Sequence, residues 1–122
     1  MTINLDQSTI GSIPGPDDIT RVELPNGITI LTRPNFNSPS VMLSGFIPAG
    51  NLYEPDEKLG LASFTADALM RGTEQRGFQQ LYDALESAGA SLGFSGGTHT
   101  TGFSCKCLAE DFDLLLGLLS DT

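Results

Sequence analysis

The sequence predicts an α+β domain in which helices pack on one face of a mainly antiparallel sheet. Short β-branched runs separated by turn residues occupy residues 19–47 and 90–108. Apolar residues at helical spacing occupy residues 59–88 and 109–122. The resulting order, β-β-β-α-α-β-β-α, mixes runs of strands with helices, which is typical of this fold class.

The leader and the domain have different compositions. Residues 1–18 are polar and end in Pro-Gly-Pro, which predicts an extended leader, because proline disfavours a helix there. The domain itself is expected to span residues 19–122.

The first three strands follow from turn residues and β-branched runs. Residues 19–24 and 28–33 are expected to pair as a hairpin, because Pro25-Asn26-Gly27 between them supplies the residues of a tight turn. A third strand is expected over residues 41–47. Its two faces are both largely apolar, which predicts a central position in the sheet.

Two helices should follow, and two strands after them. The first helix covers about residues 59–71 and ends at Gly72, and Thr73 is expected to cap the second, which ends at Gly89. Their predicted apolar stripes are Leu61, Phe64, Ala68 and Leu69, and then Phe78, Leu81, Tyr82 and Leu85. Strands over residues 90–94 and 98–108 should flank a turn at Gly96-Gly97.

The last segment, residues 109–122, has the pattern of a helix. Its predicted apolar stripe is Phe112, Leu115, Leu116 and Leu119. No returning strand follows this helix, so we expect an incomplete domain. Its open sheet edges offer a route to a homodimer.

Composition excludes several classes of partner. Six Lys and Arg against fifteen Asp and Glu give a net charge of −9, which argues against binding to nucleic acid or to an anionic membrane. No run approaches the roughly 20 apolar residues of a membrane span. The N-terminus has neither the basic nor the apolar region of a signal peptide, so we expect a cytoplasmic location.

Several features together resemble the N-terminal domain of the M16 metallopeptidases, the family of pitrilysin, insulin-degrading enzyme and mitochondrial-processing peptidase. They are an LPNG hairpin, a strand ending in AG, an acidic loop, GLA at the start of a helix, GT after its end, a GA strand and a strand rich in Ser, Thr and Gly. The resemblance covers about residues 20–122 and implies a LuxS/M16-like metallohydrolase fold.

The chemistry of that family depends on an inverted zinc motif, His-x-x-Glu-His, on the helix that opens with GLA. Two His at i and i+4 reach one zinc ion, and the Glu polarises the attacking water. The corresponding positions here are Ser63, Ala66 and Asp67. The family's third ligand, a downstream Glu, would lie past Thr122. We therefore expect no catalytic residues and no zinc in this chain, and zinc only in a catalytic partner.

Other site chemistries are less favoured by the residues. His99, Cys105 and Cys107 share one parity on a predicted strand, but His99 is too distant to join the two thiols, which are more typical of small buried apolar residues. Ser63 with Asp67 makes at most half of a catalytic triad. The acidic group formed by Glu54, Asp56 and Glu57 lacks the ligand spacing of a calcium loop and is expected to be solvated.

One binding function is independent of the zinc motif. In the family, a peptide adds as a strand to a sheet edge beside the metal, and the matching residues here are Leu92, Gly93, Phe94 and Ser95. Backbone pairing needs no special side chain, and Gly93 lets another backbone approach. The alternative is an ordinary protected strand.

These observations leave three hypotheses for function. The favoured one is a non-catalytic M16-like subunit that encloses or positions peptide for a zinc-bearing partner subunit. A second is a purely structural or assembly module on the same scaffold. A third is an autonomous metallopeptidase with a rebuilt site.

Overall fold

The structure is a computed structural model that describes residues 15–122. The chain divides into two compact units, Met1–Ser38 and Pro39–Thr122. The element order matches the prediction. The prediction of one domain over residues 19–122 stays a prediction.

The first unit contains a hairpin of two strands. β1 (Thr20–Glu23) pairs antiparallel with β2 (Thr29–Thr32), and Gly27 adopts φ +89° in the turn between them, as the turn residues predict. Pro16–Asp18 forms a short 3-10 helix (η2) within the predicted extended leader. Proline is tolerated at the first position of a helix, where no N–H is needed. The rest of the leader, residues 1–14, lies outside the described residues.

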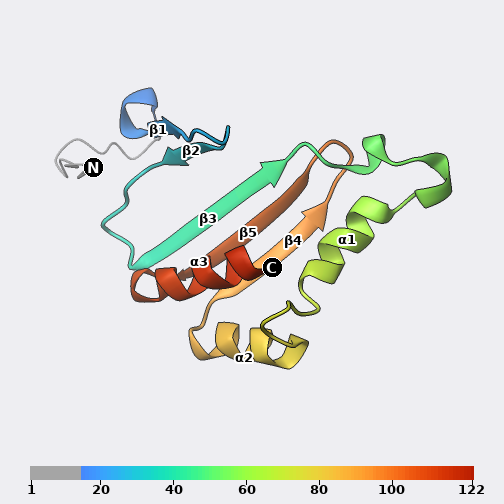
Figure 1. The fold of residues 1–122 in the computed structure, drawn as a ribbon. Coiled ribbons are helices and arrows are strands. Elements are labelled where there is room, and N and C mark those ends of the chain that lie inside the picture. The colour runs from blue at the N-terminus through green and yellow to red at the C-terminus, as the bar shows by residue number, and fades with distance from the viewer. Residues whose placement is uncertain (1–14) are drawn as a thin grey trace. The chain divides into compact units, whose positions relative to one another are not determined.

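The second unit is built on a sheet of three antiparallel strands in the order β3-β5-β4 (Figure 1). Their bounds are β3 Ser40–Ile47, β4 Ser91–Gly96 and β5 Thr101–Leu108. The prediction that residues 41–47 form a central strand is wrong for the described residues, because β5 pairs with a strand on each side and β3 lies at an edge. The apolar side chains of Met42 and Phe46 are 71% and 76% exposed.

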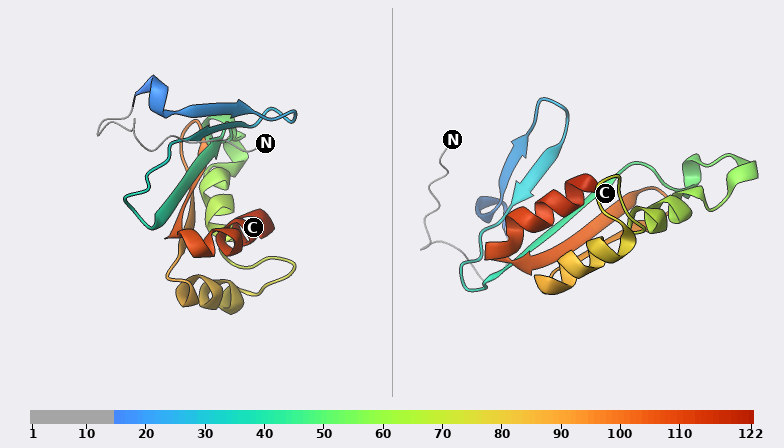
Figure 2. Two further views of the ribbon diagram at one scale, coloured as in Figure 1. Left: turned by 90° about the vertical axis from the view of Figure 1, so that its left-hand side faces the viewer. Right: turned by 60° about the horizontal axis from the view of Figure 1, so that its bottom comes forward.

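Three α-helices accompany this sheet. Their bounds are α1 Leu61–Leu69, α2 Phe78–Ser87 and α3 Phe112–Asp121. Short 3-10 helices (η3, η4, η5) form at Asn51–Tyr53, Asp56–Lys58 and Ala109–Asp111. In the right-hand view of Figure 2, α2 and α3 lie in front of the sheet, which agrees with the predicted packing on one face. None of the helices in the described part of the chain is long and apolar enough to cross a membrane.

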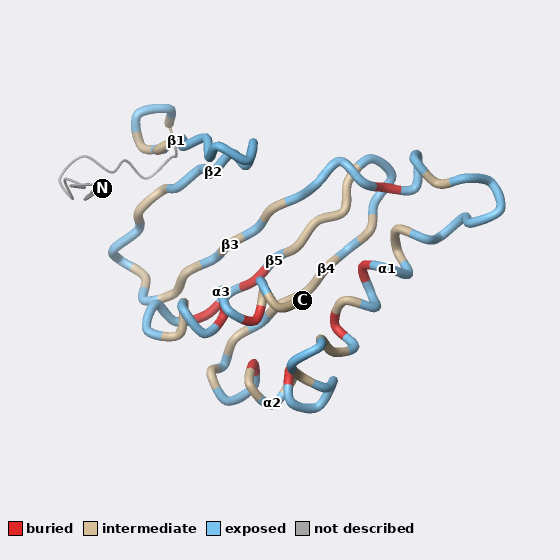
Figure 3. Tube along the Cα trace, viewed as in Figure 1, coloured by how far each residue is buried: buried red, intermediate tan, exposed pale blue. Residues whose placement is uncertain are grey.

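The core lies between the odd-numbered side chains of β5 and the helices. Figure 3 shows buried segments on β5 and along the helices. Cys105 and Cys107 are buried, and they pack with buried residues of α2, of α3 and of the position just after α1. Those residues are Met70, Leu81, Leu85, Leu115 and Leu118. The stripe of α2 is therefore confirmed at its two buried leucines. Both residues are separated by one helical turn, which is why periodicity finds them.

The predicted stripes of α1 and α3 need correction. In α1, Leu61 and Phe64 are 46% and 73% exposed, whereas Ala66 is buried. The face of α1 that meets the sheet carries small residues, which an analysis based on large apolar side chains overlooks. In α3, Leu115 is buried and Phe112 and Leu119 pack against the core, which confirms most of the predicted stripe. The stripe is wrong at Leu116, which is 44% exposed, and it omits Leu118, which is buried.

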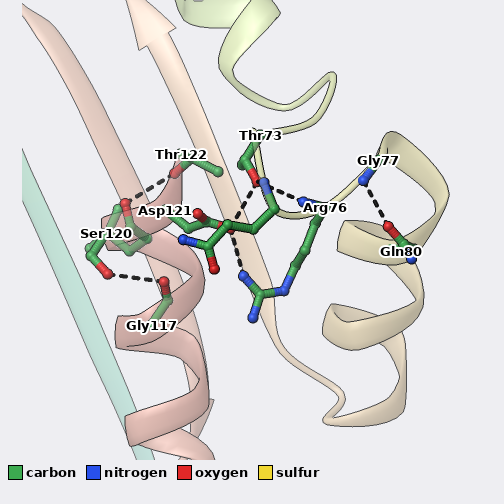
Figure 4. A network of polar contacts seen from close by, with 10 residues as sticks. Thr73, Arg76, Gly77, Gln80, Gly117, Ser120, Asp121 and Thr122 are labelled. Carbon is green, nitrogen blue, oxygen red and sulfur yellow. Dashed lines mark hydrogen bonds and ion pairs between the residues drawn. The ribbon is translucent and has the colours of Figure 1, made fainter.

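A polar network joins the end of α3 to the connection between α1 and α2 (Figure 4). The carboxylate of Asp121, with a side chain only 9% exposed, accepts a hydrogen bond from Thr73 Oγ1 at 2.8 Å and pairs with Arg76 Nη1 at 2.5 Å. Thr73 Oγ1 in turn accepts from the Arg76 N–H at 2.9 Å. Thr73 therefore orders a turn and does not cap α2. The N-cap of that helix is Gly77, whose N–H donates to Gln80 Oε1.

The packing of α2 gives a first prediction. Leu81 is fully buried, so Leu81→Ala should lower the free energy of unfolding by about 2–5 kcal/mol through lost burial and a residual cavity. Leu116→Ala is the matched control, because the same change is made on a helix at a residue that is 44% exposed. Urea denaturation followed by circular dichroism measures both. Equal losses for the two variants would contradict the described core.

Candidate functional site

The three positions of the degenerate motif lie on α1 within five residues. Ser63 and Asp67 are one helical turn apart and therefore share a face. Ser63 is half-buried, Asp67 is exposed and Ala66 is 1% exposed. The helix thus presents one hydroxyl and one carboxylate at the two His positions of the family motif, and a buried methyl group at the Glu position.

Glu54 determines where α1 begins. Its carboxylate accepts hydrogen bonds from the N–H groups of Gly60 at 2.7 Å and Ala62 at 2.6 Å. A carboxylate at this end of a helix satisfies free N–H groups and interacts favourably with the helix dipole. Gly60 adopts φ +93°, which other residues rarely do. One member of the acidic loop is therefore structural, while Asp56 and Glu57 are exposed.

A close approach at Gly96 positions α1 beside β4. A Cβ atom on Gly96 would lie only 2.7 Å from the backbone N and Cα of Ser63. The start of α1 therefore lies against the end of β4, and the later turns of the helix lie beside Leu92 and Phe94. The helix consequently runs antiparallel to the strand. Asp67 therefore lies closer to the Gly96 end of β4, and Arg71 lies farther from it.

A cleft of about 270 Å³ lies between α1, α2 and β4. Asp67 lines it from α1, Arg71 from the turn after α1, and Phe78 and Tyr82 from α2. Its other lining residues are Ala66, Met70, Leu92, Gly93 and Phe94. The cleft therefore combines an apolar base with one acidic and one basic side chain, beside the residues that sequence analysis proposed for peptide binding.

The α2 wall of this cleft was not found by sequence analysis. The rings of Phe78 and Tyr82 contact each other in a tilted arrangement, with centroids 4.6 Å apart and planes at 42°. The Arg71 guanidinium carbon lies 5.7 Å from the centroid of Phe78. Arg71 follows α1 and Phe78 begins α2, so only the turn at residues 72–77 brings them together. The available signal was an aromatic pair at i and i+4 after a Gly-containing turn.

Among the described residues, β4 is an edge strand. It pairs with β5 on one side only. Leu92, Gly93 and Phe94 are half-buried and Ser95 is exposed. The space beyond Gly93 is open, because an added Cβ would meet no atom within 4 Å. An edge strand of this kind has backbone groups that a second extended chain can pair with.

Cys105 and Cys107 do not form a common site with His99. Cys105 and Cys107 are buried free thiols, whereas His99 is exposed in the loop that precedes β5. The prediction that His99 belongs to the same strand is therefore wrong, because β5 begins at Thr101. Burial raises the pKa of both thiols; the charge of Cys107 adds to this effect at Cys105, and that of Asp111 adds to it at Cys107. The Cys105 thiol donates to the Leu43 carbonyl at 3.4 Å.

A zinc ion of the kind that the resemblance implies does not fit the motif positions. A hydroxyl is a poor zinc ligand, a methyl group is none, and zinc sites in proteins use three or four His, Cys, Asp or Glu side chains. Residues 15–122 contain no group of three or more such side chains that could hold a metal ion. The polar atoms at this site suit hydrogen bonding and ion pairing with a ligand.

Comparison with known proteins places the chain in a family. The sequence model of a family described as Insulinase (Peptidase family M16) matches residues 29–122. The chain belongs to peptidase family M16. This M16 chain is 34% identical over 116 residues to mitochondrial-processing peptidase subunit beta of Saccharomyces cerevisiae, covering 93% of the chain and 24% of that relative. It is 29% identical over 112 residues to cytochrome b-c1 complex subunit 2 of Homo sapiens, covering 89% and 24%.

Solved structures support the M16 fold. A peptidase M16 inactive domain from Pseudomonas fluorescens superimposes with a TM-score of 0.77 at 18% identity, over 84% of this chain and 25% of that one. A protease from Helicobacter pylori gives 0.74 at 17% identity, over the same shares. The predicted fold class is confirmed. The chain spans about a quarter of the length of these proteins.

The cap on α1 gives a second prediction. Glu54→Ala should lower the free energy of unfolding by about 0.5–2 kcal/mol, because two N–H groups at the start of α1 lose their acceptor. Glu57→Ala removes the same charge from an exposed neighbour and serves as the control. Urea denaturation compares the two variants. An equal change would contradict the capping role.

The buried thiols give a third prediction. Both have a raised pKa, so above about pH 8.5, where unfolded thiols ionise, the folded chain binds more protons than the unfolded chain. The free energy of unfolding should therefore fall as pH rises through this range, by at most about 1.4 kcal/mol per pH unit for each thiol. Urea denaturation between pH 7 and 10 measures the slope. A Cys105→Ala/Cys107→Ala variant should show a shallower one, and an unchanged slope would contradict the prediction.

Proposed function

We propose that this chain is part of a non-catalytic M16 subunit that holds extended peptide for a zinc-bearing partner subunit. The observation that carries the proposal is the cleft between α1 and the edge strand β4, beside motif positions at which only Asp67 could bind zinc. The peptide would add to β4 as a further strand, with alternate side chains facing the cleft. Backbone hydrogen bonds would supply affinity, and the cleft would supply selectivity.

The absence of catalysis in this chain rests on the chemistry of three side chains. Ala66 has no proton-accepting atom, so it cannot act as the base that activates water. Ser63 and Asp67 together offer one neutral hydroxyl and one carboxylate, which is too few strong ligands for a zinc centre. The cofactor belongs, in this proposal, to the partner.

The partner is proposed from the names of relatives. Mitochondrial-processing peptidase subunit beta is named as a subunit, and so are the cytochrome b-c1 complex proteins of Homo sapiens and Bos taurus. These names support a role for this chain within an assembly. They also include mitochondrial proteins, so the cytoplasmic location stays a prediction. The formation of a homodimer through the open sheet edges also stays a prediction.

A second candidate is a purely structural module. The similarity to cytochrome b-c1 complex subunits favours it, since the printed names of those relatives state membership of a complex and no peptidase activity. Saturable binding of extended peptides separates the two candidates. A structural module would assemble stably and bind none.

A backbone-modified peptide tests the proposed mode of binding. An extended heptapeptide labelled with fluorescein should bind saturably, measured by fluorescence anisotropy. N-methylation removes the N–H donors that face β4, so binding should be lost when alternate residues of one parity are methylated. Methylation at the other parity, whose donors face away, is the matched control. Equal effects of both patterns would exclude pairing with the strand edge.

Activity assays test the division of labour. The protein alone should cleave no peptide, with or without added zinc. Mixed with a zinc-bearing M16 subunit, it should change the rate of peptide cleavage. Turnover by the pure protein that a chelator abolishes and that Ser63→Ala or His99→Ala reduces would overturn the proposal in favour of a rebuilt metallopeptidase site.

A further inference from the structure

Two opposite charges line the cleft, Asp67 on α1 and Arg71 two residues after its end. Both side chains are exposed and line the same cleft, four residues apart in the sequence. Within residues 15–122, no ion pair or hydrogen bond joins the Asp67 carboxylate to another side chain. The Arg71 guanidinium is held over the Phe78 ring, which leaves its edges available to an acceptor. Each charge can therefore meet a ligand.

The spacing of these charges matches that of a strand. Asp67 lies in the last turn of α1, and Arg71 lies in the tighter turn after it, where the Arg71 N–H donates to the Ala68 carbonyl at 2.9 Å. Four residues rise about 6.0 Å in an α-helix and about 8 Å in a 3-10 helix, and these values bracket the roughly 6.6 Å rise of two residues of a strand. Because α1 runs beside β4, a peptide added to β4 would present every second side chain to α1 at nearly the separation of Asp67 and Arg71. The side chain between them would point to the other face of the sheet.

Direction along the strand fixes the order of the two charges. The helix is antiparallel to β4, with Asp67 nearer the Gly96 end of the strand. A peptide that adds antiparallel to β4, like every other strand pair in this sheet, begins at the Gly96 end. Its earlier inward-facing residue meets Asp67, and the residue two positions later meets Arg71.

We propose that the cleft selects extended peptides that carry Lys or Arg followed, two residues later, by Asp or Glu. Asp67 pairs with the basic side chain and Arg71 with the acidic one. The aromatic pair of Phe78 and Tyr82, together with the apolar base of the cleft, contacts the aliphatic stems of those side chains. This inference rests on the proposed function, since it assigns a sequence preference to the same peptide site.

Two peptides of equal composition test this order. One has the sequence Thr-Val-Lys-Val-Glu-Val-Thr and the other Thr-Val-Glu-Val-Lys-Val-Thr, both blocked at the ends and labelled with fluorescein. The first should bind about threefold or more tightly in fluorescence anisotropy, as expected for two partly exposed ion pairs, and the difference should shrink at 0.5 M NaCl. Equal binding of the two peptides would overturn the inference and leave the proposed function intact.

A charge-reversed variant provides the decisive control. Asp67→Arg combined with Arg71→Asp should invert the preference, because it inverts the order of the two charges along the cleft. Both residues are exposed, so the exchange should not disturb the core. Asp113→Arg, at an exposed residue of α3 outside the cleft, should leave the preference unchanged. A preference that survives the double exchange would assign it to other residues and overturn the inference. Failure of every peptide to bind would instead contradict the proposed function itself.

Discussion

The position of α1 beside β4 is the constraint on which the candidate site depends. It rests on Gly96, because any side chain at this residue would collide with the backbone of Ser63. The close approach brings the degenerate motif next to the edge strand, and Glu54 fixes the first turn of the helix from the preceding loop. Backbone contacts thus set the walls of the cleft, and its exposed lining side chains, Asp67, Arg71 and Phe78, can vary without moving them.

The same arrangement separates most residues of the core from the exposed residues of the cleft. The core uses the face of the sheet that carries Cys105 and Cys107, together with leucines of α2 and α3. Asp67, Arg71 and Phe78 contribute exposed side chains to the cleft. Asp121 also stabilises this arrangement, because its carboxylate bonds to Thr73 and Arg76 in the turn that leads from α1 to α2. Substitutions at these exposed residues should therefore have small effects on the free energy of unfolding.

The sequence was most informative where the signal is local. The turn at Pro25-Asn26-Gly27 and the spacing of Leu81 and Leu85 depend on neighbouring residues alone, and both predictions are confirmed. The order of the strands in the sheet depends on residues far apart in the sequence. The two apolar faces of β3 therefore led to the wrong prediction that this strand is central. The inner face of α1 was missed because close packing favours small residues there. The contact of Arg71 with Phe78 depends on how a turn folds, which periodicity cannot predict.

The burial of Ala66 has a consequence for how such a subunit changes over evolutionary time. Its side chain is 1% exposed, so a glutamate restored at this position alone would place a carboxylate in a poorly solvated site. Without a metal or another cation to compensate it, that charge would destabilise the fold. A lineage that has reached alanine here would have to regain metal ligands before, or together with, the general base. A change from glutamate to alanine at this position is therefore easier than the reverse change, because the reverse change alone buries an uncompensated charge.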